Sequence, residues 1–247
     1  MGMAEPFILS LETATLAGSI AVSRGATILA KQVGRPDVSH SNTLLSDINE
    51  ILSKLDMSIR DIDLFAVANG PGSFTGLRIG LATVKALATT LDRSCIGIPT
   101  LEAIAHSAGV ADAIVALLPA GRGEVFVQMF STEHGAVITS DSPQHLSPEK
   151  AIDKYIDRAG ILWAGEAAQL YSGLIQQRAI TAGYRFVIAD KQEVDSMKDA
   201  WIITVPALTL AEHVASLALV RAQAGLQTTA HSLKAIYVRP SDAEMKV

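Results

Sequence analysis

The residues best suited to binding an anion lie in the glycine-rich segment 70–80, which reads Gly-Pro-Gly-Ser-Phe-Thr-Gly-Leu-Arg-Ile-Gly. An apolar run at residues 64–68 precedes it and predicts a buried strand, and a helical run follows it. Amide N–H groups and the dipole at a helix N-terminus attract an anion or another chain. Three residues separate Gly72 from Gly76, whereas a P-loop has four, and G-x-G-x-x-x-G is not the dinucleotide fingerprint. Both common nucleotide motifs are therefore excluded by spacing.

The residues assigned to this predicted turn are Gly70, Pro71, Gly72, Ser73, Thr75, Gly76 and Arg78. Its glycines indicate at least one backbone φ above zero, where a Cβ atom costs roughly 1 kcal/mol or more. We therefore expect Gly72→Val to lower the thermal midpoint or to abolish partner binding.

Two further groups of polar residues could face a nucleotide. Glu12 and Thr13 follow the first predicted strand, where a carboxylate and a hydroxyl could hold a metal-bound water beneath a phosphate. A turn residue with a surface acid explains the same pair equally well. Arg122 and Glu124 flank a glycine between two predicted strands, which suits a charged pair reaching a cleft or a hairpin turn with a solvated pair.

The sequence contains none of the common patterns of catalytic or metal-binding residues. No two of the six histidines are three or four residues apart, so no helix can present paired imidazoles to a metal. Cys95 is the only cysteine, which excludes an internal disulfide and a multi-cysteine metal site. The sequence also lacks a G-x-S-x-G nucleophile elbow. We therefore predict no catalytic residues, no metal site and no tightly bound cofactor, as is typical of a binding partner rather than an enzyme.

The composition predicts a globular protein with a large core. Hydrophobic residues make up 49% of the 247 residues and charged residues 18%, and the net charge is −5. Because phosphate contacts need clustered Lys and Arg, we expect any contact with nucleic acid to be made only through a partner. No apolar stretch is long enough for a membrane span and no leader pattern is present, so we expect a cytoplasmic location.

The predicted elements form two α/β lobes. Three short strands at 7–11, 18–23 and 27–33, a helix at 39–55, a strand at 64–68 and a helix at 76–91 are followed by a weaker repeat that ends with a strand at 186–189 and a helix at 208–224. The predicted domains are residues 1–101, with the helix at 208–224 packing back on them, residues 102–206, and a tail at 225–247.

The two helices of the first lobe are the predicted partner interface. The helix at 76–91 carries apolar residues around most of its circumference, which indicates burial on two sides or an oligomer contact. The residues assigned to this interface are Leu44, Ile48, Leu52, Leu77, Leu81, Val84 and Leu87. Two such helices from each subunit could form a four-helix contact of about 800 Å² per partner. Without its partner the chain is expected to form a homodimer.

Several segments together resemble the TsaB (YeaZ) family, accessory proteins for making threonylcarbamoyladenosine in tRNA. They are residues 8–14 with 19–22, the pair His40-Ser41, the segment 70–80, and Tyr-Val-Arg-Pro at 237–240. The resemblance implies a two-lobed actin/Hsp70/sugar-kinase-like (ribonuclease H-like) α/β fold with a reduced second lobe. It also implies two partners, a homologous catalytic subunit of the TsaD type and an ATPase of the TsaE type, with ATP or ADP at the interface shared with the partner.

The sequence departs from the family pattern at three places. Glu12 stands where Asp is usual, Pro119-Ala120 where Asp-Ala is common, and Gly165-Glu166-Ala167 replaces a Gly-Asp/Asn-Gly turn. These changes argue against nucleotide hydrolysis by this chain alone. The leading hypothesis is a non-catalytic scaffold that activates the TsaD-type transferase. The alternatives are a small ATP-dependent kinase-like phosphotransferase and a metallopeptidase, for which the sequence offers no ligand set.

Overall fold

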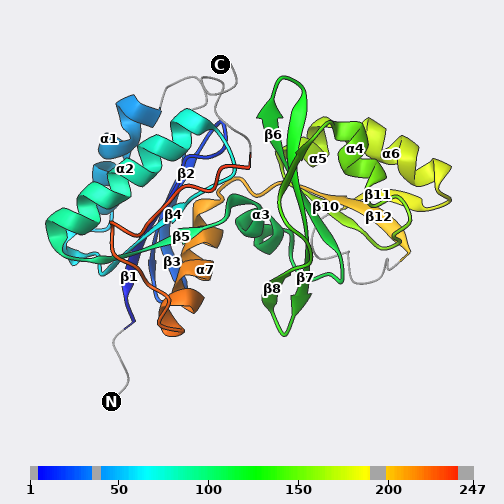
Figure 1. Ribbon diagram of the computed structural model, residues 1–247. Helices are drawn as coiled ribbons and strands as arrows, with labels where there is room; N and C mark the ends of the chain where they lie inside the picture. The colour runs from blue at the N-terminus through cyan, green and yellow to red at the C-terminus, as the bar shows by residue number, and fades with distance from the viewer. Residues whose placement is uncertain (1–4, 35–39, 190–198, 239–247) are drawn as a thin grey trace. The chain divides into compact units, whose positions relative to one another are not determined.

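The computed structural model describes residues 5–34, 40–189 and 199–238, and the chain forms two compact units (Figure 1). The first unit runs to Ala103 and takes in Leu208–Tyr237, while Ile104–Ala207 belong to the second. Each unit has a β-sheet of its own. The segment 225–237, which the sequence analysis assigned to a tail, lies within the first unit.

The first sheet has five strands in the order β3-β2-β1-β4-β5. They are β1 (Phe7–Glu12), β2 (Ser19–Arg24), β3 (Thr27–Val33), β4 (Leu64–Ala68) and β5 (Ser94–Ile98). The first three form an antiparallel meander, and β4 and β5 run parallel to β1. A parallel pair needs a helical crossover, and the chain supplies one before each of these two strands. The carboxyl ends of β1 and β4 therefore lie side by side.

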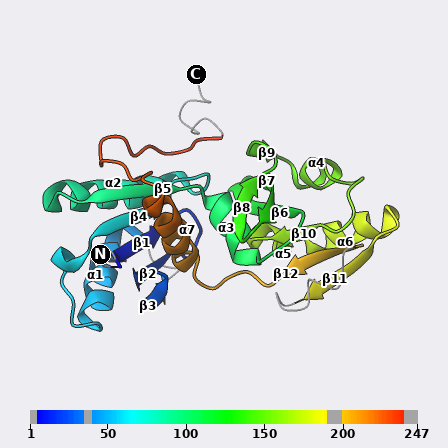
Figure 2. The ribbon, with the colours of Figure 1, turned by 90° about the horizontal axis from the view of Figure 1, so that it is seen from below.

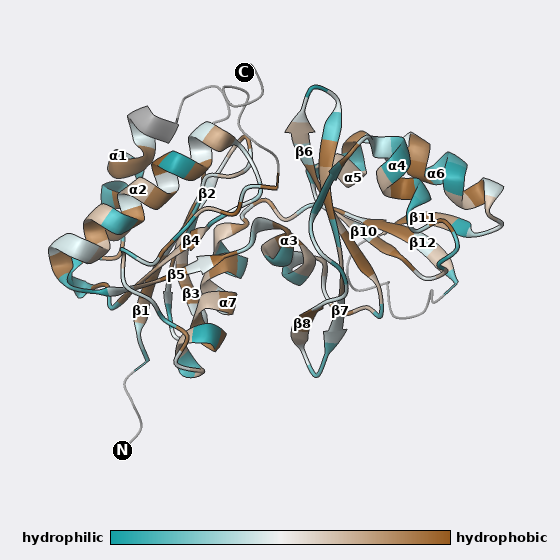
Figure 3. Cartoon of the chain, viewed as in Figure 1, coloured by the Kyte–Doolittle hydropathy of each residue, from teal (hydrophilic) through white to brown (hydrophobic). Residues whose placement is uncertain are grey.

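Helices cover both faces of this sheet. Helices α1 (His40–Ser53) and α2 (Phe74–Leu91) share a core with side chains of β1, β2 and β4 such as Leu9, Ile20 and Phe65. Helix α7 (Ala211–Gln223) contacts the same strands through residues such as Ser10, which alternate with that set along the strand and so face the other side. Figure 3 shows hydrophobic and hydrophilic segments on both α1 and α2, as expected for helices buried on one side.

The structure corrects the expectation that helix α2 is buried on two sides. Its buried residues, Gly76, Leu77, Gly80, Leu81, Val84 and Ala88, form one stripe. The exposed positions are Thr75, Arg78, Ala82, Ala86, Thr89 and Thr90. The apolar count that suggested burial on two sides came partly from alanines, which are tolerated on a helix surface. Helix α2 thus buries one face within the unit.

The second sheet repeats the meander of the first and the parallel strand beside it, but its last two strands lie in the reverse of their chain order. Strands β6 (Ile114–Gly121), β7 (Glu124–Glu133) and β8 (Ala136–Thr139) form an antiparallel meander, and the short β9 (Gln144–Leu146) also pairs with β7. Strands β10 (Leu162–Ala164), β12 (Ala200–Thr204) and β11 (Arg185–Ala189) then extend the sheet in parallel from β6. This sheet has seven strands, including β9, which pairs with β7 outside the main strand order. Strand β12, which lies between β10 and β11, was not predicted, and it is fully buried.

The helices of the second unit are shorter than those of the first. They are α4 (Pro148–Asp153), α5 (Glu166–Leu170) and α6 (Ser172–Thr181), and all three contribute to one core with Trp163 and Trp201. Residues 166–181 do not form a single helix, because the run is interrupted at Tyr171, whose ψ of 22° is not helical. Helix α3 (Thr100–Ala108) contains the boundary between the two units in the sequence.

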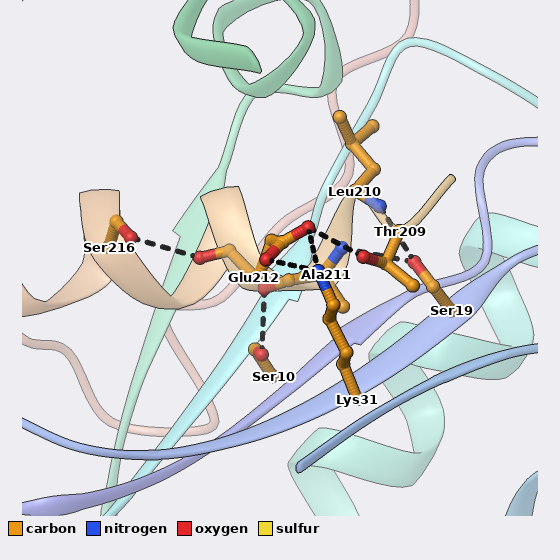
Figure 4. A network of polar contacts seen from close by, with 8 residues as sticks. All are labelled: Ser10, Ser19, Lys31, Thr209, Leu210, Ala211, Glu212 and Ser216. Carbon is orange, nitrogen blue, oxygen red and sulfur yellow. Dashed lines mark hydrogen bonds and ion pairs between the residues drawn. The ribbon is translucent and has the colours of Figure 1, made fainter. Parts of the chain in front are cut away.

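Two buried serines attach α7 to the first sheet (Figure 4). The Ser19 hydroxyl oxygen accepts hydrogen bonds from the amides of Leu210 and Ala211, at 3.1 and 3.0 Å. The Ser10 hydroxyl lies 2.8 Å from the Ala211 carbonyl oxygen, to which it donates. Since the first amides of a helix have no partner within the helix, Ser19 satisfies groups that would otherwise be buried without an acceptor.

Glu212 completes the N-terminal end of α7. Its carboxylate accepts from Thr209 Oγ1 at 2.6 Å and from Lys31 Nζ at 2.8 and 2.9 Å. Burial by itself raises the pKa of this carboxyl, but the hydrogen bonds from Lys31 and Thr209 outweigh it, and the pKa is lowered overall. The negative charge also lies in the first turn of the helix, where the dipole favours it.

We expect Glu212→Gln to reduce stability in a pH-dependent way. A pKa that is lower in the folded than in the unfolded state adds stability above the unfolded value, about 4.5, and loses it as the pH falls. The loss in the free energy of unfolding should be about 0.5–1 kcal/mol at pH 7 and vanish towards pH 3. Urea titrations at several pH values measure it, with Glu50→Gln, from the exposed Lys54 pair, as the control. A loss that persisted at pH 3 would show that charge is not its cause.

Candidate functional site

The turn between β1 and β2 holds the carboxylate on which a phosphate-binding function would depend. Glu12 is only 1% exposed. Its Oε1 accepts from the amides of Ala14 and Thr15 at 2.6 and 2.8 Å, and its Oε2 accepts from the Thr15 hydroxyl at 2.7 Å. These amides are the donors that an approaching phosphate would use. Glu12 therefore occupies the anion position of its own turn.

The same turn is bonded to the start of α2. The Thr13 hydroxyl donates to the Gly76 carbonyl at 2.8 Å, and the Ser73 amide donates to the Ala14 carbonyl at 2.8 Å. Ser73 is the N-cap of α2, and its hydroxyl oxygen accepts from the Gly76 amide at 3.2 Å. The groups at the helix start thus face the protein's own chain.

The glycines of the segment 70–80 allow this contact. A Cβ atom at Gly76 would lie 1.9 Å from the Thr13 carbonyl oxygen, and one at Gly72 would lie 2.6 Å from Ala14. At Gly80 it would meet the Thr13 hydroxyl at 2.3 Å. Close approach of α2 and the preceding segment to Thr13 and Ala14 therefore explains why these positions carry no side chain.

Gly70 supplies the positive φ that the sequence analysis expected, with a value of 116°. Gly72 is not in that region, so its restriction comes from the nearby Ala14 and not from its own backbone conformation. A Cβ atom at Gly70 would also lie 2.4 Å from the Ile236 carbonyl oxygen. Sequence reasoning missed both neighbours, because neither lies near the turn in the sequence.

A shallow hollow adjoins the turn on the side of α1. It is open to solvent, and its lining includes Glu12, Gln32, Thr43 and Asp47. Small-molecule ligands usually bind in concave, mostly apolar pockets. Because the oxygens of Glu12 already bond within the turn, Glu12 does not offer a free carboxylate to a ligand in this hollow.

Arg122 and Glu124 lie in the second unit, at the hairpin between β6 and β7. Arg122 has a φ of 53° between two glycines of positive φ, which is the backbone of a tight turn. A Glu124 carboxylate oxygen lies 2.9 Å from His145 Nε2, so this acid pairs with β9. The structure thus brings Glu12 together with Thr13 and Arg122 together with Glu124, in separate units.

The departure from the family pattern at 165–167 lies where β10 leads into α5. Gly165 has a φ of 98°, and a Cβ atom there would lie 2.3 Å from the Leu117 carbonyl oxygen. Glu166 starts the five-residue helix α5. Glycine is therefore required at 165 by the fold of this unit, while the next position accepts a long acidic side chain.

The residues predicted as the partner interface belong to the core. Leu44, Ile48, Leu52, Leu77, Leu81 and Val84 are each at most 7% exposed, and only Leu87 is partly exposed. A surface that meets a partner must be accessible in the free chain, so these six side chains cannot form it. The apolar stripe of each helix faces its own sheet, because burial of that stripe holds the unit together. The prediction that these six residues form the partner interface is therefore wrong.

The described parts of the chain contain no group of three or more His, Cys, Asp or Glu side chains placed to hold a metal ion. Within the same residues, no helix is both long and apolar enough to cross a membrane.

These observations define the class of the protein: an α/β protein of two units, each with an antiparallel meander extended by parallel strands, in which the β1–β2 turn of the first unit is bonded to the start of α2. Residues 36–241 match the family model described as tRNA N6-adenosine threonylcarbamoyltransferase, TsaD.

Comparisons with relatives and with a solved structure identify the family more specifically. The chain is 28% identical over 180 residues to the tRNA threonylcarbamoyladenosine biosynthesis protein TsaB of Bacillus subtilis, covering 72% of this chain and 78% of the relative. It is 31% identical over 176 residues to TsaB of Haemophilus influenzae, covering 64% and 72%. YeaZ from Pseudomonas aeruginosa superposes with a TM-score of 0.72 at 24% identity, over 94% of this chain and 99% of that one. The chain belongs to the TsaB (YeaZ) family, and the predicted fold class is confirmed.

We expect Gly76→Ala to destabilise the first unit strongly. The added Cβ would collide with the Thr13 backbone, so the helix and the turn must separate, at a cost of about 2–4 kcal/mol in the free energy of unfolding. Gly173→Ala is the matched control, because that Cβ meets nothing within 4 Å and α6 should gain up to about 1 kcal/mol. Denaturant unfolding of both variants measures the difference. Equal stability of Gly76→Ala and the parent would refute the close contact.

Proposed function

We propose that this protein acts in the biosynthesis of threonylcarbamoyladenosine in tRNA as a non-catalytic partner that activates a homologous threonylcarbamoyltransferase of the TsaD type. Membership of the TsaB family supports the pathway, since the relatives from Bacillus subtilis, Escherichia coli and Haemophilus influenzae carry that biosynthesis in their names. A TsaD family model that covers residues 36–241 supports a partner of the same fold.

The observation that carries the non-catalytic role is the bonding of Glu12. A general base, or a carboxylate that holds a metal-bound water, must present an oxygen to the reacting group. Both Glu12 oxygens instead accept hydrogen bonds within the turn, and the carboxylate is almost fully buried. Thr13 is likewise bonded to Gly76. A kinase-like transfer by this turn would first require these bonds to break.

The partner surface in this proposal is the outer face of α1 and α2. On α2 it consists of the exposed residues Arg78, Ala82 and Ala86 with neighbouring threonines, and on α1 it includes Leu45, which is 67% exposed. Small side chains let a second helix approach closely, and the two helices contact each other within the unit. The proposal keeps the two helices named in the sequence analysis and moves the partner surface to their outer faces.

The proposal includes further partners, and one of them, a second copy of the chain, uses the same surface. Without the transferase, the chain covers it by forming a homodimer. A TsaE-type ATPase joins the complex, and ATP or ADP is bound at an interface shared with a partner rather than by this chain alone. Contact with tRNA is through the transferase, because the net charge of −5 does not favour binding a polyanion directly.

Steady-state turnover of Mg-ATP tests the non-catalytic role. The purified chain should give no turnover above background, with or without small alcohols as acceptors. Together with the transferase and the ATPase, it should be required for tRNA modification. Turnover by the pure chain that disappeared in Glu12→Gln would favour the kinase-like alternative instead.

A charged substitution on the outer face of α2 tests whether this face binds the transferase. We expect Ala82→Glu to leave the fold intact, because this position is exposed, and to weaken transferase binding at least ten-fold by placing an unpaired charge in a packed interface. The variant should also be a monomer by sedimentation. Ala136→Glu, at an exposed alanine of β8 in the second unit, is the control and should behave as the parent. A monomeric Ala82→Glu that still supported modification at the parental rate would place the surface elsewhere.

A further inference from the structure

The segment after α7 forms a strap, residues 226–237, that returns to the first sheet. Helix α7 ends at Gln223. Gly225, in the turn that follows, has a φ of 73°, and the Leu226 amide donates back to the Arg221 carbonyl at 2.9 Å. Such a helix end turns the chain sharply. The strap then reaches the edge strand β5, where Thr228 and Cys95 exchange backbone hydrogen bonds of 2.9 Å.

One buried side chain anchors the strap. Leu233 is 3% exposed and belongs to the core that α1 and α2 share, on the opposite face of the sheet from α7. A Cβ atom at Gly97 would lie 2.9 Å from Leu233 Cδ1, so the glycine in β5 leaves room for it. The strap therefore passes from the α7 side, around the β5 edge, to the α2 side, and Figure 2 shows its end running beside α2.

The end of the strap contacts the residues that lead into α2. The Ile236 amide donates to the Asn69 carbonyl at 2.7 Å, and Asn69 Nδ2 donates to the Lys234 carbonyl at 3.0 Å. The Ile236 carbonyl lies against Gly70. Asn69 and Gly70 directly precede the Ser73 cap, so the strap fixes the approach of the chain to that helix.

Tyr237 extends this contact onto the helix itself. Its ring lies 5.2 Å from that of Phe74, in the first turn of α2, with 39° between the planes. The Arg78 guanidinium carbon lies 3.8 Å from the centroid of the Phe74 ring. Tyr237 is 49% exposed, and Arg78 is exposed. Within the described residues, no carboxylate pairs with Arg78.

We propose that the strap is the positioning element of the partner surface: Tyr237 and Phe74 hold Arg78 in place, and Arg78 binds a carboxylate of the transferase. This inference rests on the proposed function and deepens it. A guanidinium held on an aromatic ring keeps its N–H donors available for a carboxylate. Because its side chain is already ordered, less conformational entropy is lost when the partner binds. The acidic partner side chain completes an ion pair for which the described residues supply no carboxylate.

Aromatic substitutions at Tyr237 test the positioning. We expect Tyr237→Ala to weaken transferase binding about three- to ten-fold, which is the range of an aromatic pair, while Tyr237→Phe retains the ring and stays within about two-fold of the parent. Leu226→Ala, at another exposed residue of the strap, is the control. Hydrogen exchange should be faster in Tyr237→Ala than in Tyr237→Phe for the amides of residues 73–78.

A double-mutant cycle separates positioning from a general structural effect. If Tyr237 acts through Arg78, then Tyr237→Ala should cost little more in a chain that already carries Arg78→Ala. The effect of Arg78→Ala should also shrink as salt rises, since an exposed ion pair is screened. Additive effects, or a Tyr237→Ala variant that binds as the parent does, would overturn the inference. Failure of the parent chain to bind the transferase would instead remove the proposed function, and the exchange data would still decide whether the strap positions α2.

Discussion

The contact between Thr13 and Gly76 is the constraint on which the first unit depends. A carbonyl oxygen of the β1–β2 turn lies where any side chain at residue 76 would have to be, and the Thr13 hydroxyl bonds to the carbonyl of the same glycine. This contact sets how closely α2 approaches the sheet. The helix axis then determines which residues of α2 enter the core and which remain outside. The chemistry of the turn and the surface of the helix thus follow from one close approach.

The two units share the arrangement of strands around their first strand. In both, a three-strand antiparallel meander is extended by parallel strands, so the carboxyl end of the first strand lies beside that of the parallel strand next to it. In doubly wound sheets a ligand usually binds at the carboxyl ends of the strands where the order reverses. At the end of β1 in the first unit, Glu12 and Thr13 bond to groups of this chain.

Satisfying a buried carboxylate also explains why the turn is stable. A carboxyl group that is 1% exposed needs hydrogen-bond partners, and Glu12 accepts from two amides and a hydroxyl. The longer side chain at this position can fold back onto its own turn. The acid that suggested catalysis in the sequence therefore has a structural role in the folded chain.

Much of the first unit could be predicted from local pattern. The strands at 27–33 and 64–68 and the helix ending at Leu91 agree with β3, β4 and α2, because alternation and helical periodicity are properties of a few neighbouring residues. Local sequence pattern did not predict the elements whose type depends on their length or on contacts with distant residues. Strand β12 is a five-residue apolar run between polar segments, and the run from 166 to 179 breaks at Tyr171.

The sequence by itself determined the family, the α/β class and the absence of paired histidines, since these depend on residue types and their spacing. Tertiary structure alone decided the rest of the site. The leucines of α1 and α2 form an apolar stripe whether they face a sheet or a partner, and only the position of the sheet shows that they are buried. The partners of Gly70 and Phe74 come from the strap, more than 150 positions away, and no local pattern encodes such a contact. Periodicity fixes which residues share a face, and packing fixes what that face meets.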